Sequence, residues 1–248
     1  MPFDRLATGI DPDLIHWFDS LDSTMNEAAR LAHAGAPSGT IVGADEQTRG
    51  LGRLGHAWHS EKDAGLYVSF LLRIQVAAAD LPVVTLALGL AAAEAITKTA
   101  GVPCDLRWPN DVLAGGKKCC GILTQLHAGA IVAGIGINVN HTNFPEEISL
   151  QATSLRIVAG HAYSREALLG RLAAAINIFT CILVHDGKEA IFRLFENASS
   201  YARGRRVIVD DSMTGTTAGL DSNGFLILHK DDGVDTLVLA GGVRPFEE

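Results

Sequence analysis

Hydrophobic and polar residues recur along this chain in two different periods, which divide it into predicted helices and strands. Helical periodicity extends over residues 23–34, 81–99, 164–184 and 188–201. In the first of these helices, Thr24 and Glu27 have capping-box spacing, and Gly35 follows where a C-terminal cap is expected. Asp80 is the expected N-cap of the second helix, which has Pro82 in its first turn.

Segments rich in β-forming residues lie between and after these helices. Strands are predicted at residues 39–45, 66–72, 106–108, 119–127 and 130–137, and shorter ones at 206–209, 214–219, 225–229 and 236–239. Ala128-Gly129 is an expected tight hairpin. Because the strands outnumber the helices without strict alternation, the predicted fold class is α+β with a mixed sheet.

Two changes in the residue pattern indicate how the chain is organised. Residues 46–64 are rich in Gly, His and Arg and follow neither period, which predicts a long loop. After Gly204 the chain consists of short strands cut by turn signals, which predicts a small β-barrel. The predicted domains are therefore residues 1–203 and 204–248.

Composition and charge narrow the classes of partner. The 248 residues are 48% hydrophobic and 19% charged, which is typical of a globular protein with a sizeable core. The net charge of -8 is opposite in sign to that of a nucleic-acid-binding surface. We expect a cytoplasmic protein without a membrane segment, because neither a leader nor an uninterrupted apolar stretch of roughly 18 to 20 residues is visible. The four cysteines lack C-x-x-C spacing and are expected to be reduced thiols.

The long loop is the first candidate for chemistry. Gly50–Gly55 has G-x-G-x-x-G spacing, but neither the following helix nor the later acidic residue of a dinucleotide fingerprint is predicted. The glycines and the guanidinium groups of Arg49 and Arg53 favour an anion-binding loop, and a solvated surface loop is the alternative. His56 and His59 alone make an incomplete metal pair, so surface histidines and no protein-held metal are expected.

Two further clusters contain polar residues at predicted strand ends. Pro109 interrupts a strand-like run, so the sheet is expected to break where Asn110 and Asp111 can face a ligand. Lys118 immediately precedes a hydrophobic strand, where a solvated lysine that blunts a sheet edge is the alternative. The segment 134–140 ends a buried strand with two glycines and Asn138, which permits close approach of a ligand.

Together these clusters resemble biotin protein ligases, also called biotin–[acetyl-CoA-carboxylase] ligases. The resemblance extends over nearly the whole chain, through Asp22-Ser23-Thr24, the Gln47–Trp58 loop, Trp108-Pro109-Asn110-Asp111, Lys118 with Gly121-Ile122-Leu123, and Gly136-Ile137-Asn138. It implies a mixed-sheet catalytic domain followed by an SH3-like barrel. The form implied is monofunctional, because the roughly 20 residues before Asp22 are too few for a DNA-binding module.

The resemblance also implies a role for each matched residue. The implied biotin-binding residues are Ser23, Thr24, Gln47, Gly50, Leu51, Gly52, Arg53, Lys118, Gly121 and Gly136. The implied nucleotide-binding residues are Trp58, Asn110, Asp111, Lys118 and Asn138. Lys118 and Arg53 are the implied catalytic residues, the first bridging the biotin carboxylate and the α-phosphate and the second holding the intermediate.

The reaction implied by the resemblance has two steps. Biotin and ATP give biotinyl-5′-adenylate, and a lysine of a biotin carboxyl carrier protein, from acetyl-CoA carboxylase or a related enzyme, then takes the biotinyl group. Mg²⁺ is expected to be held mostly by phosphates and water. No specific DNA binding is expected, and a homodimer through an exposed sheet edge is common in the family.

Two departures from the family pattern keep alternatives open. The loop reads Gly50-Leu51-Gly52-Arg53 instead of the usual Gly-Arg-Gly-Arg, and Arg49 can replace the missing guanidinium only if the loop stays extended. The C-terminal segment also departs from the pattern, which leaves a nucleotide contact by Arg244 open. The alternative functions are a lipoate or octanoate protein ligase, whose Arg-Arg-x-x-Gly-Gly-Gly pattern is absent, and an inactive biotin-binding regulator.

Overall fold

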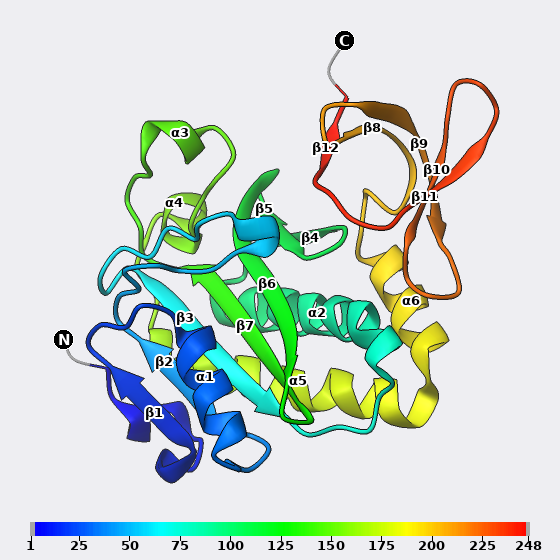
Figure 1. Ribbon diagram of the computed structural model, residues 1–248. Coiled ribbons are helices and arrows are strands. Elements are labelled where there is room, and N and C mark those ends of the chain that lie inside the picture. The colour runs from blue at the N-terminus through cyan, green and yellow to red at the C-terminus, as the bar shows by residue number, and fades with distance from the viewer. Residues whose placement is uncertain (1–2, 247–248) are drawn as a thin grey trace.

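The protein is built around two β-sheets, which a computed structural model describes over residues 3–246 (Figure 1). The larger sheet is mixed, with the strand order β1-β2-β3-β7-β6-β5-β4, and the smaller is antiparallel, with the order β11-β10-β9-β8-β12. The larger sheet comprises β1 Ile15–Phe18, β2 Ile41–Ala44, β3 Gly65–Leu72, β4 Cys104–Arg107, β5 Asp111–Ala114, β6 Lys117–His127 and β7 Ala130–Asn138. The smaller comprises β8 Arg203–Val209, β9 Met213–Leu220, β10 Leu226–His229, β11 Asp235–Val238 and β12 Val243–Pro245. The α+β class with a separate C-terminal β-module is confirmed.

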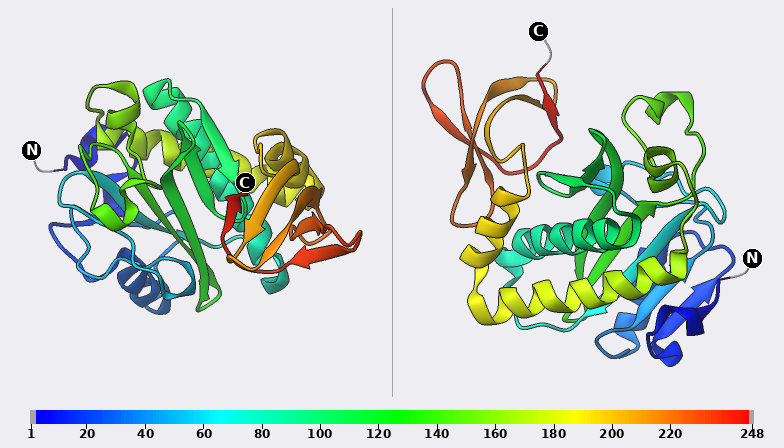
Figure 2. Two further views of the ribbon diagram at one scale, coloured as in Figure 1. Left: turned by 90° about the horizontal axis from the view of Figure 1, so that it is seen from above. Right: turned by 180° about the vertical axis from the view of Figure 1, so that it is seen from behind.

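Helices cover both faces of the larger sheet. Helix α1 lies on one face, and α2 and α5 lie on the other (Figures 1 and 2). The helices are α1 Thr24–His33, α2 Leu81–Ala100, α3 Glu146–Ser149, α4 Leu155–Ala159, α5 Arg165–Asp186 and α6 Lys188–Asn197. Single 3-10 turns occupy Arg5–Thr8, Pro12–Leu14, Arg53–Gly55 and Ala78–Asp80. Helix α6 leads from α5 into the smaller sheet.

The ends of α1 and α2 differ in detail from the sequence prediction. Ser23 is the N-cap of α1, and its Oγ accepts a hydrogen bond from the Met25 amide at 3.3 Å. The predicted capping box is therefore wrong, since Thr24 is already the first helical residue. Asp80 does precede α2, but its carboxylate lies 3.7 Å from Lys188 Nζ and makes no capping hydrogen bond.

Helix α2 is the central helix of the hydrophobic core. Its side chains pack on the sheet on one side and on α5 on the other, and most are fully buried. By length and composition alone, Ala78–Ala100 and Arg165–Asp186 would each suffice to cross a membrane, although the sequence analysis singled out neither. In the first of them, 67% of the apolar window is buried inside the protein, which is the ordinary position of a core helix.

Three short strands escaped the sequence prediction. β1, β5 and β12 have only three or four residues each, too few for alternation to be recognised. β4 ends at Arg107, so the prediction that Trp108 belongs to the strand was wrong; Trp108 and the cis-linked Pro109 form the turn into β5. The hairpin at Ala128-Gly129 is confirmed, and both residues have positive φ as a two-residue turn requires.

Trp108 links the two sheets. Its indole is 3% exposed, and its Nε1 donates a hydrogen bond of 2.9 Å to the carbonyl of Gly224, in the turn between β9 and β10. A Cβ at Gly224 would meet Phe192 of α6 and Leu86 of α2, so this turn is packed tightly against the larger part of the protein. The smaller sheet is therefore held by a buried polar contact as well as by apolar packing.

Replacement of Trp108 by phenylalanine tests this link. Trp108→Phe removes the indole donor and leaves the Gly224 carbonyl without its buried partner. We expect the free energy of unfolding to fall by about 1–3 kcal/mol, measured by urea denaturation. An unchanged denaturation midpoint would show that the contact contributes nothing to holding the smaller sheet.

Candidate functional site

A trough without side chains runs across the larger sheet on the face where α1 lies. Gly121 of β6 pairs directly with Gly136 of β7, and Gly134 lies two residues earlier on the same face of β7. A Cβ at Gly136 would lie 2.5 Å from Trp58 Nε1, and one at Gly121 would lie 2.9 Å from Trp58 Cζ3. The paired glycines thus leave room for a flat group, and the indole of Trp58 occupies it.

The long loop between β2 and β3 covers this trough and borders a pocket whose empty volume, open solvent included, is about 440 Å³. Loop residues form one wall, α1 contributes another, and β3, β6 and β7 form the floor. The lining residues are Thr24, Met25, Gln47, Leu51, Gly52, Arg53, Trp58, Tyr67, Val68, Asn110, Lys118, Gly121, Ile122, Leu123, Gly134, Ile135 and Gly136. We call this the trough pocket.

Lys118 reaches the trough pocket because of a β-bulge. Val112 of β5 pairs with Cys120 and Leu113 pairs with Lys118, so Cys119 is an extra residue in β6. In a regular strand Lys118 and Gly121 would face opposite sides, but the extra residue places them on the same side. A Cβ at Gly121 would lie 3.3 Å from Lys118 Nζ. Lys118 is therefore inside an interior strand, and its predicted position before the strand was wrong.

Asp111 holds the ammonium of Lys118 in place. The Nζ atom lies 2.6 Å from Asp111 Oδ1, while Arg107 Nη2 donates to Asp111 Oδ2 at 2.8 Å. The same ammonium lies 5.4 Å from the centre of the Trp58 ring, within the range of a cation–π contact. One carboxylate thus lies between two cations, so the pocket keeps a net positive charge at this end.

Arg53 brings a second cation to the same end of the trough pocket. Its Nη1 donates to Asn110 Oδ1 at 3.3 Å, and Asn110 in turn donates to the Ile122 carbonyl at 2.9 Å. Burial lowers the pKa of the Arg53 guanidinium, and the charges of Asp111 and Asp210 oppose this effect. The guanidinium remains protonated at any physiological pH.

Polar groups gather at the opposite end of the trough pocket, at the start of α1. Gln47 Oε1 accepts from the Thr24 amide at 2.9 Å and from Thr24 Oγ1 at 3.1 Å, and Ser69 Oγ donates to Thr24 Oγ1 at 2.9 Å. Gln47 Nε2 donates to Ser60 Oγ at 3.0 Å. The pocket therefore has neutral donors and acceptors at one end and cations at the other, separated by the glycine floor.

A second, larger pocket adjoins the trough pocket and reaches the C-terminal sheet. Its empty volume is about 1220 Å³, and we call it the outer pocket. It is lined by residues 56–59, 107–111, Lys118, Asn138, Phe144, Ile148, 151–152 and 241–244. Asn138 lies at its inner side and donates to the Thr153 carbonyl at 3.0 Å, while Arg244 at its rim pairs with Asp211 at 2.9 Å.

The structure brings together most of the residues singled out from the sequence. Thr24, Gln47, Leu51, Gly52, Arg53, Trp58, Asn110, Lys118, Gly121 and Gly136 line the trough pocket, and Asp111 and Asn138 line the outer one. Ser23 and Gly50 line neither: Ser23 caps α1, and Gly50 is packed against the Trp58 carbonyl and Ser60. Arg49 is 81% exposed and lies 3.9 Å from Asp22, so it does not take the place of a guanidinium at Leu51.

Several pocket residues were missed by the sequence analysis. Met25, Tyr67 and Val68 line the trough pocket. Gly134 also lines it, and a Cβ there would meet the Met25 side chain. Arg107 was not singled out either, because its contact with Asp111 depends on how β4 and β5 pair. Alternation in β3 would have placed Tyr67 on one face of a strand, but nothing local indicates which face meets the loop.

Both ends of the long loop are fixed by Arg165 of α5. Its guanidinium lies 2.9 Å from Asp45, at the start of the loop, and 3.4 Å from Asp63, near its end. The Asp63 amide also donates to the Asp45 carbonyl at 3.0 Å. Since Arg165 and Asp45 are both buried, the two ends of the loop are held together while its middle lies over the trough.

Comparison with known proteins identifies the family. Residues 17–141 match the biotin/lipoate A/B protein ligase family. The bifunctional ligase/repressor BirA of Bacillus subtilis is 34% identical over 247 residues, which cover 95% of this chain and 75% of that protein. The biotin–[acetyl-CoA-carboxylase] ligase of Mycobacterium tuberculosis is 32% identical over 226 residues, covering 86% of this chain and 81% of that protein. The chain belongs to the biotin/lipoate A/B protein ligase family.

A solved structure of the same family supports the assignment. The biotin protein ligase from Aquifex aeolicus, in complex with biotin and ATP, superimposes with a TM-score of 0.81 at 32% sequence identity. The match covers 93% of this chain and 97% of that one, so it includes the C-terminal sheet as well as the family domain. The family fold, including the smaller sheet, is therefore present along almost the whole chain.

The close contact between Gly136 and Trp58 can be tested directly. In Gly136→Ala the added methyl group would collide with the indole, so Trp58 should leave the trough and become accessible to solvent. We expect stronger quenching of tryptophan fluorescence by acrylamide than in the parent protein. Gly134→Ala is the matched control, because its methyl group meets only the flexible Met25 side chain among the nearby side chains. Equal quenching in the two variants would contradict the contact.

Proposed function

We propose that this protein joins biotin to ATP with release of pyrophosphate, and then transfers the biotinyl group to a lysine of a carrier protein. Membership of the family and the kinship with biotin protein ligases support this assignment. The observation that carries it is the position of Lys118, because the β-bulge directs its side chain into one end of the side-chain-free trough. A bicyclic ligand with a carboxylate at one end and a neutral urea at the other has the complementary shape and polarity.

The trough pocket is the proposed biotin site. The ureido group is placed at Thr24 and Gln47, because a urea both donates and accepts hydrogen bonds. The fused rings lie over Gly121 and Gly136, in the space next to these glycines where the Trp58 indole lies, so the indole has to move outward when biotin enters. Leu51 and Gly52 cover the ligand from the loop side, and the valeryl chain leads towards Lys118.

The proposed first step brings two anions together at Lys118 and Arg53. A carboxylate oxygen of biotin attacks the α-phosphorus of ATP, and the bond to the β-phosphate oxygen breaks, releasing pyrophosphate. Lys118 bridges the carboxylate and the α-phosphate, and Arg53 offsets the charge that builds on the phosphoryl oxygens. No proton has to be transferred in this step, so cations and positioning suffice.

Asn110 and Asp111 have separate positioning roles in this proposal. Asn110 orients the Arg53 guanidinium, and Asp111 orients the Lys118 ammonium with help from Arg107. Asp111 is the one carboxylate among the described residues that line the two pockets, and its charge is already shared by two cations. Mg²⁺ is therefore proposed to be held by the phosphates and water, as a small cation that keeps much of its hydration shell.

The outer pocket is the proposed nucleotide site and the entrance for the carrier lysine. Trp58 and Asn138 line it beside Lys118, and the C-terminal sheet forms its far wall. In the second step the neutral amine of the carrier lysine attacks the biotinyl carbonyl carbon, the bond to the AMP phosphate breaks, and the amine loses its proton to water. The proposed acceptor is a biotin carboxyl carrier protein of acetyl-CoA carboxylase or a related enzyme.

Other properties of the chain remain proposals of the same kind. We propose that the activity is cytoplasmic and needs no membrane, because it uses ATP and a carboxylase carrier. The net charge of -8 argues against specific DNA binding. The outer strands of the larger sheet are β1 and β4, which are the edges through which a homodimer is predicted. A lipoate-type ligase or an inactive biotin-binding protein is the alternative, and biotin-dependent pyrophosphate release distinguishes both.

Lys118→Met tests the proposed first step. The substitution keeps the length of the side chain and removes its charge, so we expect biotin-dependent pyrophosphate release to fall by about 100-fold or more. Lys117→Met is the matched control, since Lys117 is exposed and its Nζ donates to the Ser149 carbonyl away from the trough. Full activity in Lys118→Met would refute the role of this lysine, and a lack of biotin-dependent release in the parent would refute the ligase function.

Arg53→Ala tests whether the loop retains the adenylate. Without this guanidinium the intermediate should dissociate faster, by about tenfold or more, as expected for loss of a charge-assisted hydrogen bond. The measurement is the release of labelled biotinyl-5′-AMP in a rapid-dilution experiment. Arg49→Ala, which removes an exposed arginine of the same loop, should behave like the parent. Slow release from Arg53→Ala would contradict the assignment.

A further inference from the structure

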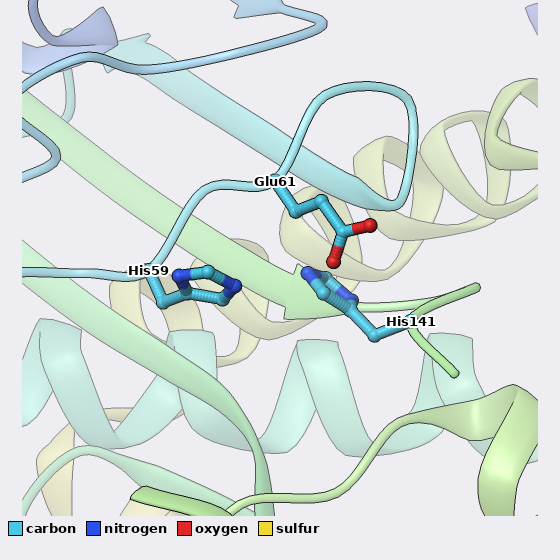
Figure 3. Close-up of side chains that lie close together, drawn as sticks. All are labelled: His59, Glu61 and His141. Atoms are coloured by element: carbon cyan, nitrogen blue, oxygen red, sulfur yellow. The ribbon is translucent and has the colours of Figure 1, made fainter. Parts of the chain in front are cut away.

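Three side chains of metal-ligating types lie together where the long loop returns to the sheet. None of them has a role in the proposed reaction. His59 and Glu61 come from the loop, and His141 follows the end of β7 (Figure 3). One ligating atom from each of the three lies within 4.8 Å of the others. Figure 3 shows a ring nitrogen of each histidine and a carboxylate oxygen of Glu61 pointing into the same space.

His141 is fully buried and only partly satisfied by hydrogen bonds. Its Nε2 lies 3.1 Å from the hydroxyl of Tyr67, which also donates to the Glu61 carbonyl at 2.9 Å. Its Nδ1 is buried and has no hydrogen-bond partner among the described residues. A buried polar atom without a hydrogen-bond partner destabilises the folded state. The surrounding protein thus leaves one hydrogen-bonding atom of the imidazole unsatisfied.

His141 is held in place by hydrogen bonds to the backbone around it. The amide of Asn140 donates to the Ala64 carbonyl at 2.6 Å, which joins the end of the loop to the residue before His141. On the other side, Ser154 Oγ donates to the His141 carbonyl at 2.7 Å. His141 also stacks on Phe144, with ring centres 5.0 Å apart. These contacts fix the backbone on both sides of His141 and join it to the end of the loop.

We propose that His59, Glu61 and His141 form a binding site for a divalent transition-metal cation of the zinc type, which clamps the returning end of the long loop to the end of β7. Two imidazoles and one carboxylate are a common ligand set for zinc with one position left open. Imidazole nitrogens favour such cations over Mg²⁺, which prefers oxygen. His59 is partly exposed and Glu61 is exposed, and both line an open cavity, so water can complete the coordination.

This proposal replaces the expectation of surface histidines without a metal. The cluster does not include His56, the other histidine of the pair considered from the sequence. The third ligand lies more than 70 residues further along the chain, so local spacing could not indicate it. Since His59 follows Trp58 directly, a bound cation would fix the segment that follows the indole covering the trough.

Metal binding by the intact protein tests the proposal. After treatment with a chelator, the protein is titrated with Zn²⁺ by calorimetry and with Co²⁺ by visible absorption. We expect one tight site per chain with a Co²⁺ spectrum of low coordination number. His59→Ala and Glu61→Gln should each weaken binding by at least about tenfold, since even groups outside the ligand shell are worth roughly 10- to 100-fold. Neither change touches a fully buried side chain.

His56→Ala is the matched control and should bind Zn²⁺ as the parent does, because His56 is an exposed histidine of the same loop. Zn²⁺ should also raise the melting temperature and slow amide exchange over residues 59–64 in the parent and the control, but in neither ligand variant. A parent that binds no Zn²⁺ would overturn the proposal. Binding that survives in both ligand variants would also overturn it and would point to other surface groups.

Discussion

The site depends on one constraint, which is that two directly paired strands carry glycine at the same level of the sheet. Gly121 and Gly136 face each other across β6 and β7, and a Cβ on either would overlap the Trp58 indole. Because these two positions have no side chains, the sheet has a flat floor there. The covering loop, the start of α1 and the Lys118 ammonium are arranged around this gap. The site therefore depends on the two side chains that the sheet lacks.

The position of the Lys118 ammonium at the end of this floor depends on the β-bulge in β6. The extra residue Cys119 changes the side of β6 on which Lys118 lies, and Asp111 then holds its ammonium from the adjacent strand. Because Arg107 shares the same carboxylate, the triad carries a net positive charge and can still attract an anion. A regular strand with the same sequence would direct Lys118 into the opposite face, where hydrophobic residues and α2 lie.

Sequence reasoning identified the parts of the site but not their assembly. The long helices, the loop and the strands β3, β6 and β7 were predictable because their periodicity extends over many residues, and the motif at Trp108–Asp111 is specific enough to indicate the family. The bulge at Cys119 leaves no periodic signal, so the direction of Lys118 was not predictable. Contacts that join distant segments, such as Trp108 with Gly224 or His59 with His141, depend on topology and have no counterpart in local spacing.

The ion pairs of Arg165 have a consequence for how the covering loop moves. Asp45 and Asp63 both pair with one buried guanidinium, so the loop is closed at its base and is not a free segment. Ordering such a closed loop over a ligand costs less conformational entropy than ordering an unrestrained segment of the same length. A ligand bound beneath the loop therefore loses less of its affinity to the ordering of the loop.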